Sequence, residues 1–203
     1  MESKLVVGVI PDGNRKWAHK TGTELVQAYH QGADVAIEVL KTAMELGNVG
    51  RIVFYALSHE NFQLRPPEQV QAILVGIEKF LYLTRNLVDV AVQCHGDHRP
   101  TEVNRLAKLG VDTTDPLMRV DLLLHYSAGW DMETRPIRTA SIPPLDAVIR
   151  TSGQTRLSGF LPWQSSYAQF LFTNTLWTDF TSIEFLKMMA IYKEIRGNGL
   201  TGV

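Results

Sequence analysis

The sequence is poor in cysteine, in net charge and in long apolar runs, and each shortage excludes a class of protein. A formal net charge of −1 over 203 residues argues against a general binder of nucleic acids or anionic membranes. The single cysteine, Cys94, cannot form an intramolecular disulfide and lies in a strand-like run, so we expect a packing role and a reducing, cytoplasmic location. No apolar stretch approaches the roughly 20 residues of a transmembrane helix, and the run LVVGVI is too short for a signal peptide.

Metal-ligand patterns are missing as well. None of the six histidines stands in an H-x-x-x-H or similar spacing, so we expect no zinc site. With 45% hydrophobic and 20% charged residues, the composition is that of an ordinary globular protein. The length suits one domain over residues 1–203.

Apolar runs and helical patterns alternate along the chain. Strands are expected at 5–10, 51–58, 88–94, 120–127, 145–151 and 170–173, and helices at 34–46, 65–87, 101–110 and 181–195. This order predicts an α/β fold with an open, mostly parallel β-sheet flanked by helices, in which ligands bind at the carboxyl ends of the strands. The proline-rich segment 131–144 is expected to be a loop, and whether it orders only with substrate is left open.

The first predicted strand ends in Asp12-Gly13-Asn14, followed by the cations Arg15 and Lys16. Glycine permits a backbone turn with positive φ, and successive N–H groups there can converge on an anion such as phosphate. A carboxylate beside a phosphate is repelled unless a cation lies between them. Asp12 therefore predicts a Mg²⁺ ion shared with a diphosphate. An ordinary turn without a ligand is the alternative that this pattern leaves open.

The second predicted strand is followed by Ser58, Asn61 and Arg65. Polar side chains just past a buried strand either bind ligands or cap helices, and Asn61, which precedes a proline-started helix, suits both roles. Arg65 is harder to assign to capping, because a guanidinium has no acceptor for the free N–H groups at a helix start.

The fifth predicted strand ends at Arg150, and Arg156 and Ser158 follow in an R-x-S pattern. Two guanidinium groups beside glycine-turned backbone are suited to holding a diphosphate through paired hydrogen bonds. Surface salt bridges are the alternative. The group Asp97-His98 is interpreted as a strand-end turn rather than a catalytic pair.

Four blocks in a fixed order carry a family resemblance: PDGNRKWA, YALSHENFQLRPPE, LHYSAGWDM and DAVIRTSGQTRLSGFLPWQSSYAQFLFTNTLWTDF. Together they resemble the cis-prenyltransferases, the undecaprenyl diphosphate synthase superfamily, over most of the chain. The resemblance implies a hydrophobic tunnel between sheet and helices, with two isoprenoid diphosphate sites at its mouth. It also implies Mg²⁺ as cofactor and a homodimer.

The resemblance assigns roles to the residues at the strand ends. Asp12 and Asn61 are expected to be catalytic, and Asp12 would also position Mg²⁺ and assist departure of the allylic diphosphate. Substrate binding is expected from Gly13, Asn14, Arg15, Lys16, Trp17, Ser58, Arg65, Arg150, Arg156 and Ser158. Of these, the last three match the family's residues for the second, acceptor diphosphate.

Several positions depart from the family's pattern. Arg15 replaces a glycine, and Lys16 replaces an arginine that grips phosphate. Tyr29 stands where an ungapped alignment places a histidine, which His30 would recover only with a one-residue gap. Gln169 replaces a glutamate that helps to bind Mg²⁺ with the acceptor, and a neutral amide is a poorer ligand for this hard cation than a carboxylate.

These departures favour a short-chain prenyl diphosphate synthase that condenses dimethylallyl, geranyl or isopentenyl diphosphate. Because the altered position belongs to the acceptor site, we predict irregular head-to-middle (lavandulyl-type) coupling of two allylic diphosphates. Regular 1′-4 condensation with isopentenyl diphosphate to a short or medium Z-prenyl diphosphate is an alternative, and a non-catalytic partner subunit is another. Bulky side chains at 80–82 either plug the tunnel or belong to the core.

Overall fold

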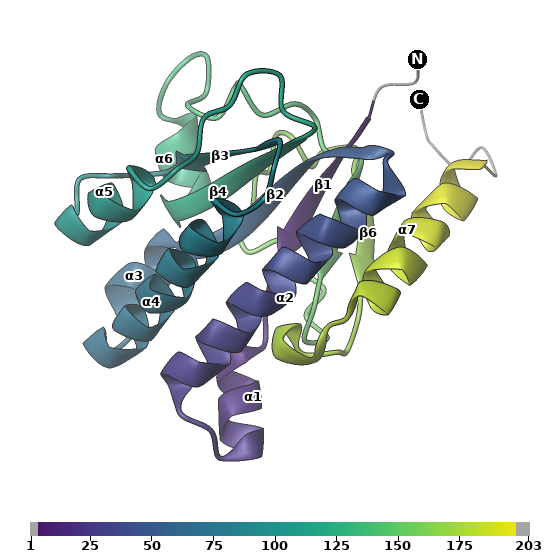
Figure 1. Cartoon of the computed structure of the whole chain (residues 1–203). Helices are drawn as coiled ribbons and strands as arrows, with labels where there is room; N and C mark the ends of the chain where they lie inside the picture. Colours follow the sequence, from purple (N-terminus) through teal and green to yellow (C-terminus); the bar gives the residue numbers. More distant parts are fainter. Residues whose placement is uncertain (1–3, 198–203) are drawn as a thin grey trace.

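The computed structural model describes residues 4–197, which form a parallel sheet in the order β3-β4-β2-β1-β5-β6 (Figure 1). The strands are β1 (Leu5–Ile10), β2 (Val49–Ser58), β3 (Val90–His95), β4 (Met118–Tyr126), β5 (Ala147–Arg150) and β6 (Gln169–Phe172). The helices are α1 (Asn14–Thr21), α2 (Leu25–Leu46), α3 (His59–Leu64), α4 (Pro67–Thr84), α5 (Thr101–Ala107), α6 (Ala128–Met132) and α7 (Ser182–Gly197), with a 3-10 turn at Trp177–Asp179. The predicted open, parallel α/β sheet is confirmed.

Helices α2, α4, α5 and α7 lie on one face of the sheet (Figure 1). Their apolar side chains share one core with strand residues such as Val7, Ile52 and Leu122. Cys94 packs against this core, and burial raises the pKa of its thiol to about 12, which confirms the packing role. Among the described helices, none is long and apolar enough to cross a membrane.

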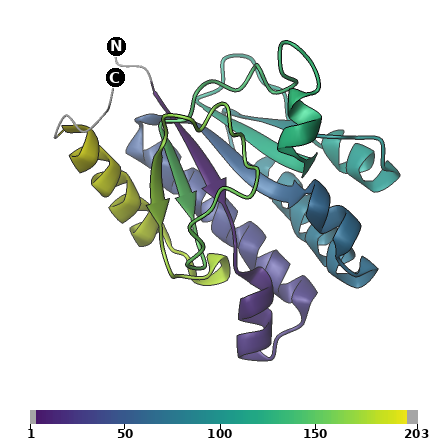
Figure 2. The same cartoon turned by 180° about the vertical axis from the view of Figure 1, so that it is seen from behind.

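The opposite face of the sheet is covered mainly by irregular chain (Figure 2). Its smaller core joins strand residues such as Tyr126 to Leu145, Phe160 and Leu161 from the segments around β5. The predicted loop 131–144 begins inside α6, so the prediction is wrong for its first two residues, which are helical.

This loop is anchored by a buried carboxylate. Asp131 accepts hydrogen bonds from the Tyr126 hydroxyl (2.9 Å), from the Thr139 backbone N–H (2.8 Å) and from the Thr139 hydroxyl (2.7 Å). Thr139 is itself fully buried and accepts from the amide of Gln164. A segment without regular structure is therefore tied to the sheet through side-chain hydrogen bonds.

Helix α2 begins at Leu25 rather than at the predicted residue 34, and Gly32 lies inside the helix. A Cβ added to Gly32 would lie 2.6 Å from Oδ1 of Asn14 and 3.1 Å from the Trp177 ring. The glycine is required by close packing and does not mark a helix end. At the other end, Gly47 caps the helix in the left-handed conformation, directly after the predicted end of the helix at residue 46.

Candidate active site

A cavity of about 820 Å³ opens at the carboxyl ends of β1, β2 and β5 and extends between α2, α4 and the sheet. Its volume lies in the range of sites for small molecules. The space exists because small residues face it, where larger side chains would fill it. These are Ala33 and Ala36 on α2 and Ala56 on β2.

The inner walls of the cavity are apolar. Phe54, Ile77, Phe80 and Leu122 line them, and the rings of Phe54 and Phe80 meet edge to face with centroids 5.6 Å apart. At 1.5 Å per residue, Phe80 lies about 20 Å along α4 from its first residue. The cavity thus has an aromatic wall far from its polar mouth.

Only one of the three bulky residues at 80–82 lines this space. Leu81 is fully buried in the core away from the cavity, and Tyr82 is 51% exposed, with the Arg85 guanidinium over its ring. The plug interpretation is therefore wrong for Leu81 and Tyr82, because successive positions on a helix point in different directions. It remains open for Phe80.

The mouth of the cavity carries an excess of positive charge. Two carboxylates, Asp12 and Glu60, face five cations: Arg15, Lys16, Arg65, Arg150 and Arg156. The whole chain has a net charge of −1, so the cations are concentrated at this site. Such a mouth attracts and holds an anion with several charged oxygens.

The backbone of Asp12 is fixed by Thr151, which directly follows the neighbouring strand β5. The Thr151 hydroxyl accepts from the Asp12 N–H (2.9 Å) and donates to the Asp12 carbonyl (2.7 Å). Gly13 follows with φ 120°, and a Cβ there would lie 3.1 Å from Leu176. The predicted glycine turn is confirmed, and it leads directly into α1.

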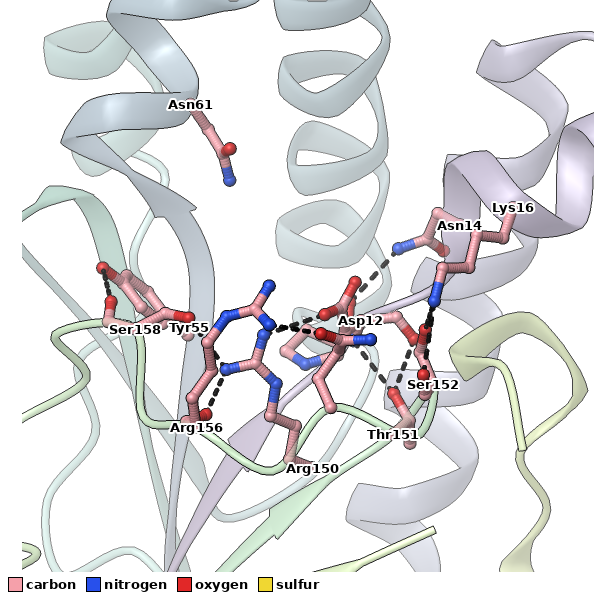
Figure 3. Close-up of polar contacts among 12 residues, drawn as sticks. Asp12, Asn14, Lys16, Tyr55, Asn61, Arg150, Thr151, Ser152, Arg156 and Ser158 are labelled. Carbon is pink, nitrogen blue, oxygen red and sulfur yellow. Dashed lines mark hydrogen bonds and ion pairs between the residues drawn. The ribbon is translucent and has the colours of Figure 1, made fainter. Parts of the chain in front are cut away.

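Arg150 joins the residues predicted for the two diphosphates (Figure 3). Its buried guanidinium donates to Asp12 Oδ2 (2.9 Å) and to the Ser158 hydroxyl (2.9 Å), and also to the Arg156 carbonyl. Residues separated by more than a hundred positions in the sequence thus form one cluster. Donor groups that remain on Arg156 face the same mouth.

Asp12 suits a Mg²⁺ ion that is shared with a phosphate ligand. Its side chain is 35% exposed in the cavity mouth, and only Oδ2 has a protein partner among residues 4–197. Oδ1 is available, and Mg²⁺ usually takes one or two carboxylate oxygens together with substrate phosphates and water.

Lys16 and Arg15 are both held at the rim. The Lys16 ammonium donates to the Ser152 hydroxyl (2.8 Å), and Arg15 donates to the Gln69 side chain (3.3 Å) on α4. Both line the cavity, as the substrate-binding prediction requires. Ser152 had no signal in the sequence that distinguished it from an ordinary turn residue.

On the opposite rim, Asn61 and Arg65 belong to α3 and its end. Ser58 is the N-cap, because its hydroxyl accepts from the Asn61 backbone N–H (3.0 Å). The helix-cap interpretation of Asn61 is therefore wrong, and its side chain instead accepts from Arg65 Nε (2.9 Å). Ser58, Asn61 and Arg65 all line the cavity.

Trp17, which was expected to bind substrate, lies outside the cavity, and so do Asp97 and His98, which were not. Trp17 does not line the cavity, and its indole N–H donates to Asp179 (2.7 Å), which ties α1 to the 3-10 turn. Asp97 pairs with Arg99, which lowers the pKa of its carboxyl to about 2. Neither Asp97 nor His98 lines the cavity, in agreement with the strand-end interpretation.

Several lining residues escaped sequence reasoning. Phe54 and Tyr55 lie inside a predicted strand, and Trp177 lies in the fourth sequence block with no role assigned to it, so only the packing shows that they border a cavity. Burial raises the pKa of Tyr55, so its hydroxyl keeps its proton and bonds the Ser158 carbonyl (3.3 Å). Tyr29 was singled out only as a departure from a family pattern.

Comparisons with known proteins point to one family. The family described as putative undecaprenyl diphosphate synthase matches the chain over residues 10–136 and 132–198. An isoprenyl transferase of Aquifex aeolicus is 30% identical over 92% of this chain and 91% of that protein. An isoprenyl transferase of Streptococcus pyogenes is 31% identical over 92% of this chain and 88% of that protein.

Among solved structures, the lavandulyl diphosphate synthase of Lavandula x intermedia, in complex with dimethylallyl diphosphate, has a similar fold. The TM-score is 0.76 with 23% identity, over 94% of this chain and 95% of that chain. At this identity the likeness supports the fold. The family match and the two isoprenyl transferases, together with the cation-rich mouth above an apolar cavity, show that the chain belongs to the undecaprenyl diphosphate synthase family of prenyltransferases.

Proposed function

We propose that this prenyltransferase couples two small allylic diphosphates head to middle, giving a short branched product. The observation that carries the proposal is the Arg150 cluster, in which one guanidinium contacts both Asp12 and Ser158. Two diphosphates held by this cluster would have their hydrocarbon parts in the same apolar cavity. The moderate cavity volume and the aromatic wall at Phe54 and Phe80 favour a short product.

The reaction requires that negative charge be stabilised while a carbocation is protected from water. The C1–O bond of one substrate breaks, and both electrons leave with the diphosphate. The double bond of the second substrate supplies the electron pair for the new C–C bond, and the resulting cation loses a proton to an oxygen of the released diphosphate. Arg150, Lys16 and Arg156 bind the negative charge, and the apolar walls exclude water.

Asp12 is the proposed metal ligand. Mg²⁺, when bound there, would neutralise part of the negative charge on the departing diphosphate. Asp12 also holds Arg150 in place, so one carboxylate orients both the guanidinium and the metal. Asn61 is proposed as a catalytic donor to the same diphosphate, and Gly13 and Asn14 supply the turn that brings the backbone to it.

The proposal of an allylic acceptor comes from Gln169. In the sequence, its amide replaces the glutamate that helps to bind Mg²⁺ in the family that this chain resembles. In the structure of the single chain, Gln169 begins β6 and does not line the cavity. The carboxylates that do line the cavity are Asp12 and Glu60. Among the described residues, the cavity therefore offers no further carboxylate that could bind a second metal beside Arg156 and Ser158.

We also propose a homodimer. The edge strand β6 presents the stacked rings of Phe170 and Phe172, and the neighbouring Trp163 and Tyr167 are 73% and 80% exposed. Exposed aromatic groups of this kind are enriched at interfaces. Light scattering of the purified protein would report the mass, and a monomer at micromolar concentration would contradict the dimer.

The decisive experiment is product analysis. The purified protein would be incubated with Mg²⁺ and dimethylallyl or geranyl diphosphate, with and without isopentenyl diphosphate, and the dephosphorylated alcohols identified by gas chromatography and mass spectrometry. A branched alcohol without isopentenyl diphosphate supports irregular coupling. Linear Z-products that require isopentenyl diphosphate would establish regular condensation. No turnover with any pair would favour a partner subunit.

A Gln169→Glu variant sharpens this test. If the amide sets the acceptor, the carboxylate variant should gain activity with isopentenyl diphosphate and a stronger dependence on Mg²⁺ concentration. Unchanged acceptor preference and unchanged metal dependence would remove the argument from Gln169. Gln71, a glutamine on the exposed side of α4, serves as the matched control when it is changed to Glu in the same way.

A further inference from the structure

Three side chains from different elements form a hydrogen-bonded chain at the rim opposite Asp12. Arg65, at the end of α3, donates through Nη1 to the Tyr29 hydroxyl on α2 (3.0 Å) and through Nε to Asn61 Oδ1 (2.9 Å). All three line the cavity. The guanidinium is thus held from both sides, by a phenol and by an amide.

The position of Tyr29 is fixed by the packing of two long helices. A Cβ added to Gly76 on α4 would lie 2.8 Å from the Tyr29 Cβ and 2.9 Å from its carbonyl oxygen. The backbones of α2 and α4 therefore approach closely at this point, and the base of the Tyr29 side chain has little freedom. By contrast, α3 is a single short helix of six residues. Tyr29 is the rigid end of the chain of three.

The chemistry of arginine orients the amide. A guanidinium has donors only, so the Asn61 atom that faces Arg65 has to be the oxygen. The amide NH₂ group is then directed elsewhere, and in Figure 3 the amide end of Asn61 points towards the cluster of Arg150 and Asp12. The contact with Arg65 thus makes Asn61 a hydrogen-bond donor to the mouth.

The phenol is suited to hold a cation without changing its charge. Burial raises the pKa of Tyr29, against the opposing effect of the Arg65 charge, so the hydroxyl stays protonated at neutral pH. It accepts from Arg65 through its oxygen. Its own O–H has no acceptor among residues 4–197, and the cavity lies beside it.

We infer that Tyr29 is a positioning residue: through Arg65 it holds the Asn61 amide as a donor to a diphosphate bound at the mouth. The inference rests on the proposed function in that the ligand is a diphosphate. It does not depend on which second substrate is used. Tyr29 on α2 thus positions the side chains of Arg65 and Asn61, which belong to α3 and its end.

A double-mutant cycle tests this coupling. Binding of inorganic diphosphate in the presence of Mg²⁺ would be measured by calorimetry for the wild type, Tyr29→Phe, Arg65→Met and the double variant. Loss of a hydrogen bond to a charged group predicts about tenfold weaker binding for Tyr29→Phe. The double variant should bind no more weakly than Arg65→Met alone, because Tyr29 acts through Arg65. Tyr82→Phe, at an exposed tyrosine of α4, is the control and should bind like the wild type.

The outcomes separate this inference from the proposed function. If the wild type binds diphosphate and Tyr29→Phe binds equally well, or weakens binding additively with Arg65→Met, the positioning role is refuted while prenyl coupling stands. If the wild type binds no diphosphate, both fail. Coupled binding in a protein without turnover would support the role of Tyr29 and refute the enzyme activity.

A Tyr29→His variant supplies a readout that a merely structural role would not change. A histidine must present an unprotonated nitrogen to Arg65, and its ordinary pKa is about 6.5. At pH 8 the imidazole is mostly neutral and can accept from Arg65 in place of the phenol, so Tyr29→His should recover part of the diphosphate affinity that Tyr29→Phe loses. An affinity of Tyr29→His no better than that of Tyr29→Phe at this pH, in variants shown by circular dichroism to be folded, would overturn the inference.

Discussion

The two rims of the cavity are built differently. On the β5 side, Asp12, Thr151 and Arg150 are joined to each other and to strand backbones, and Arg150 is buried. On the α3 side, Asn61 and Arg65 depend on a short helix that is attached through the Ser58 cap and through Tyr29. The comparison teaches that one rim is preformed by the sheet, while the other is held by a few side-chain contacts.

The largest expected effect comes from removing the charge of Asp12, which holds Arg150 on the β5 rim. Asp12→Asn loses the ion pair with Arg150 and the metal ligand together, so we expect kcat to fall about a thousandfold. Product formation from geranyl diphosphate would be the measurement. Asp34→Asn, at an exposed pair with Lys79, is the matched control. A fall of less than tenfold for Asp12→Asn would contradict the assigned role.

A second prediction concerns the attachment of the same rim to the sheet. Thr151→Val keeps the side-chain shape but removes both hydrogen bonds that the fully buried Thr151 hydroxyl makes with the Asp12 backbone. The free energy of unfolding should fall by about 2 kcal/mol. Urea denaturation measures it, and Thr101→Val, at an exposed threonine of α5, is the control. An unchanged stability would show that this rim is less tightly built than the contacts indicate.

The α3 rim should respond locally instead. Ser58→Ala removes the cap of a six-residue helix, which typically costs about 1 kcal/mol. Hydrogen exchange of the amides in α3 should accelerate, while those of β1 and β5 stay protected. The diphosphate affinity should fall less than in Arg65→Met. Acceleration spread evenly over the sheet would mean that the two rims are not independent.

The smallest expected effect is a pH dependence of stability that arises at His125, which packs against His59 of α3. The ring of His59 stacks on that of His125 with centroids 4.4 Å apart, and His125 Nε2 is buried without a protein partner in the described chain. Burial chiefly lowers the pKa of His125, and the His59 and Arg99 charges lower it further, whereas the Asp97 carbonyl and carboxylate raise it. Burial also lowers the pKa of His98.

The sign of the effect follows from proton binding. Because these histidines have lower pKa values in the folded state, the unfolded chain binds more protons below about pH 6.5. The free energy of unfolding should therefore decrease as the pH falls from 7 to 5. Denaturation at several pH values would measure the slope. His125→Asn should flatten it, and asparagine tolerates the positive φ of 51° found there. An unchanged slope in this variant would remove His125 as the cause.

Sequence patterns were sufficient for most of the architecture. Uninterrupted apolar runs such as 5–10 occur because strands of a parallel sheet are buried on both faces, and Gly47 and Pro67 mark helix ends by their backbone conformations. The predicted start of the helix at residue 34 was wrong, because α2 begins at Leu25 and includes Gly32, which packs closely against Asn14 and Trp177. Helix α3 was also missed, because six residues are too few to show a helical period.

For the site, the sequence determined which chemical groups are present and that they follow strands. The order β3-β4-β2-β1-β5-β6 then places β1 beside both β2 and β5, so the ends of these strands meet at one edge. Only the tertiary structure decided that Arg150 bridges Asp12 and Ser158, that Tyr29 holds Arg65, and that Trp17 lies outside. Hydrogen bonds between distant residues depend on angles and distances of a few ångströms, which local patterns of residue type do not specify.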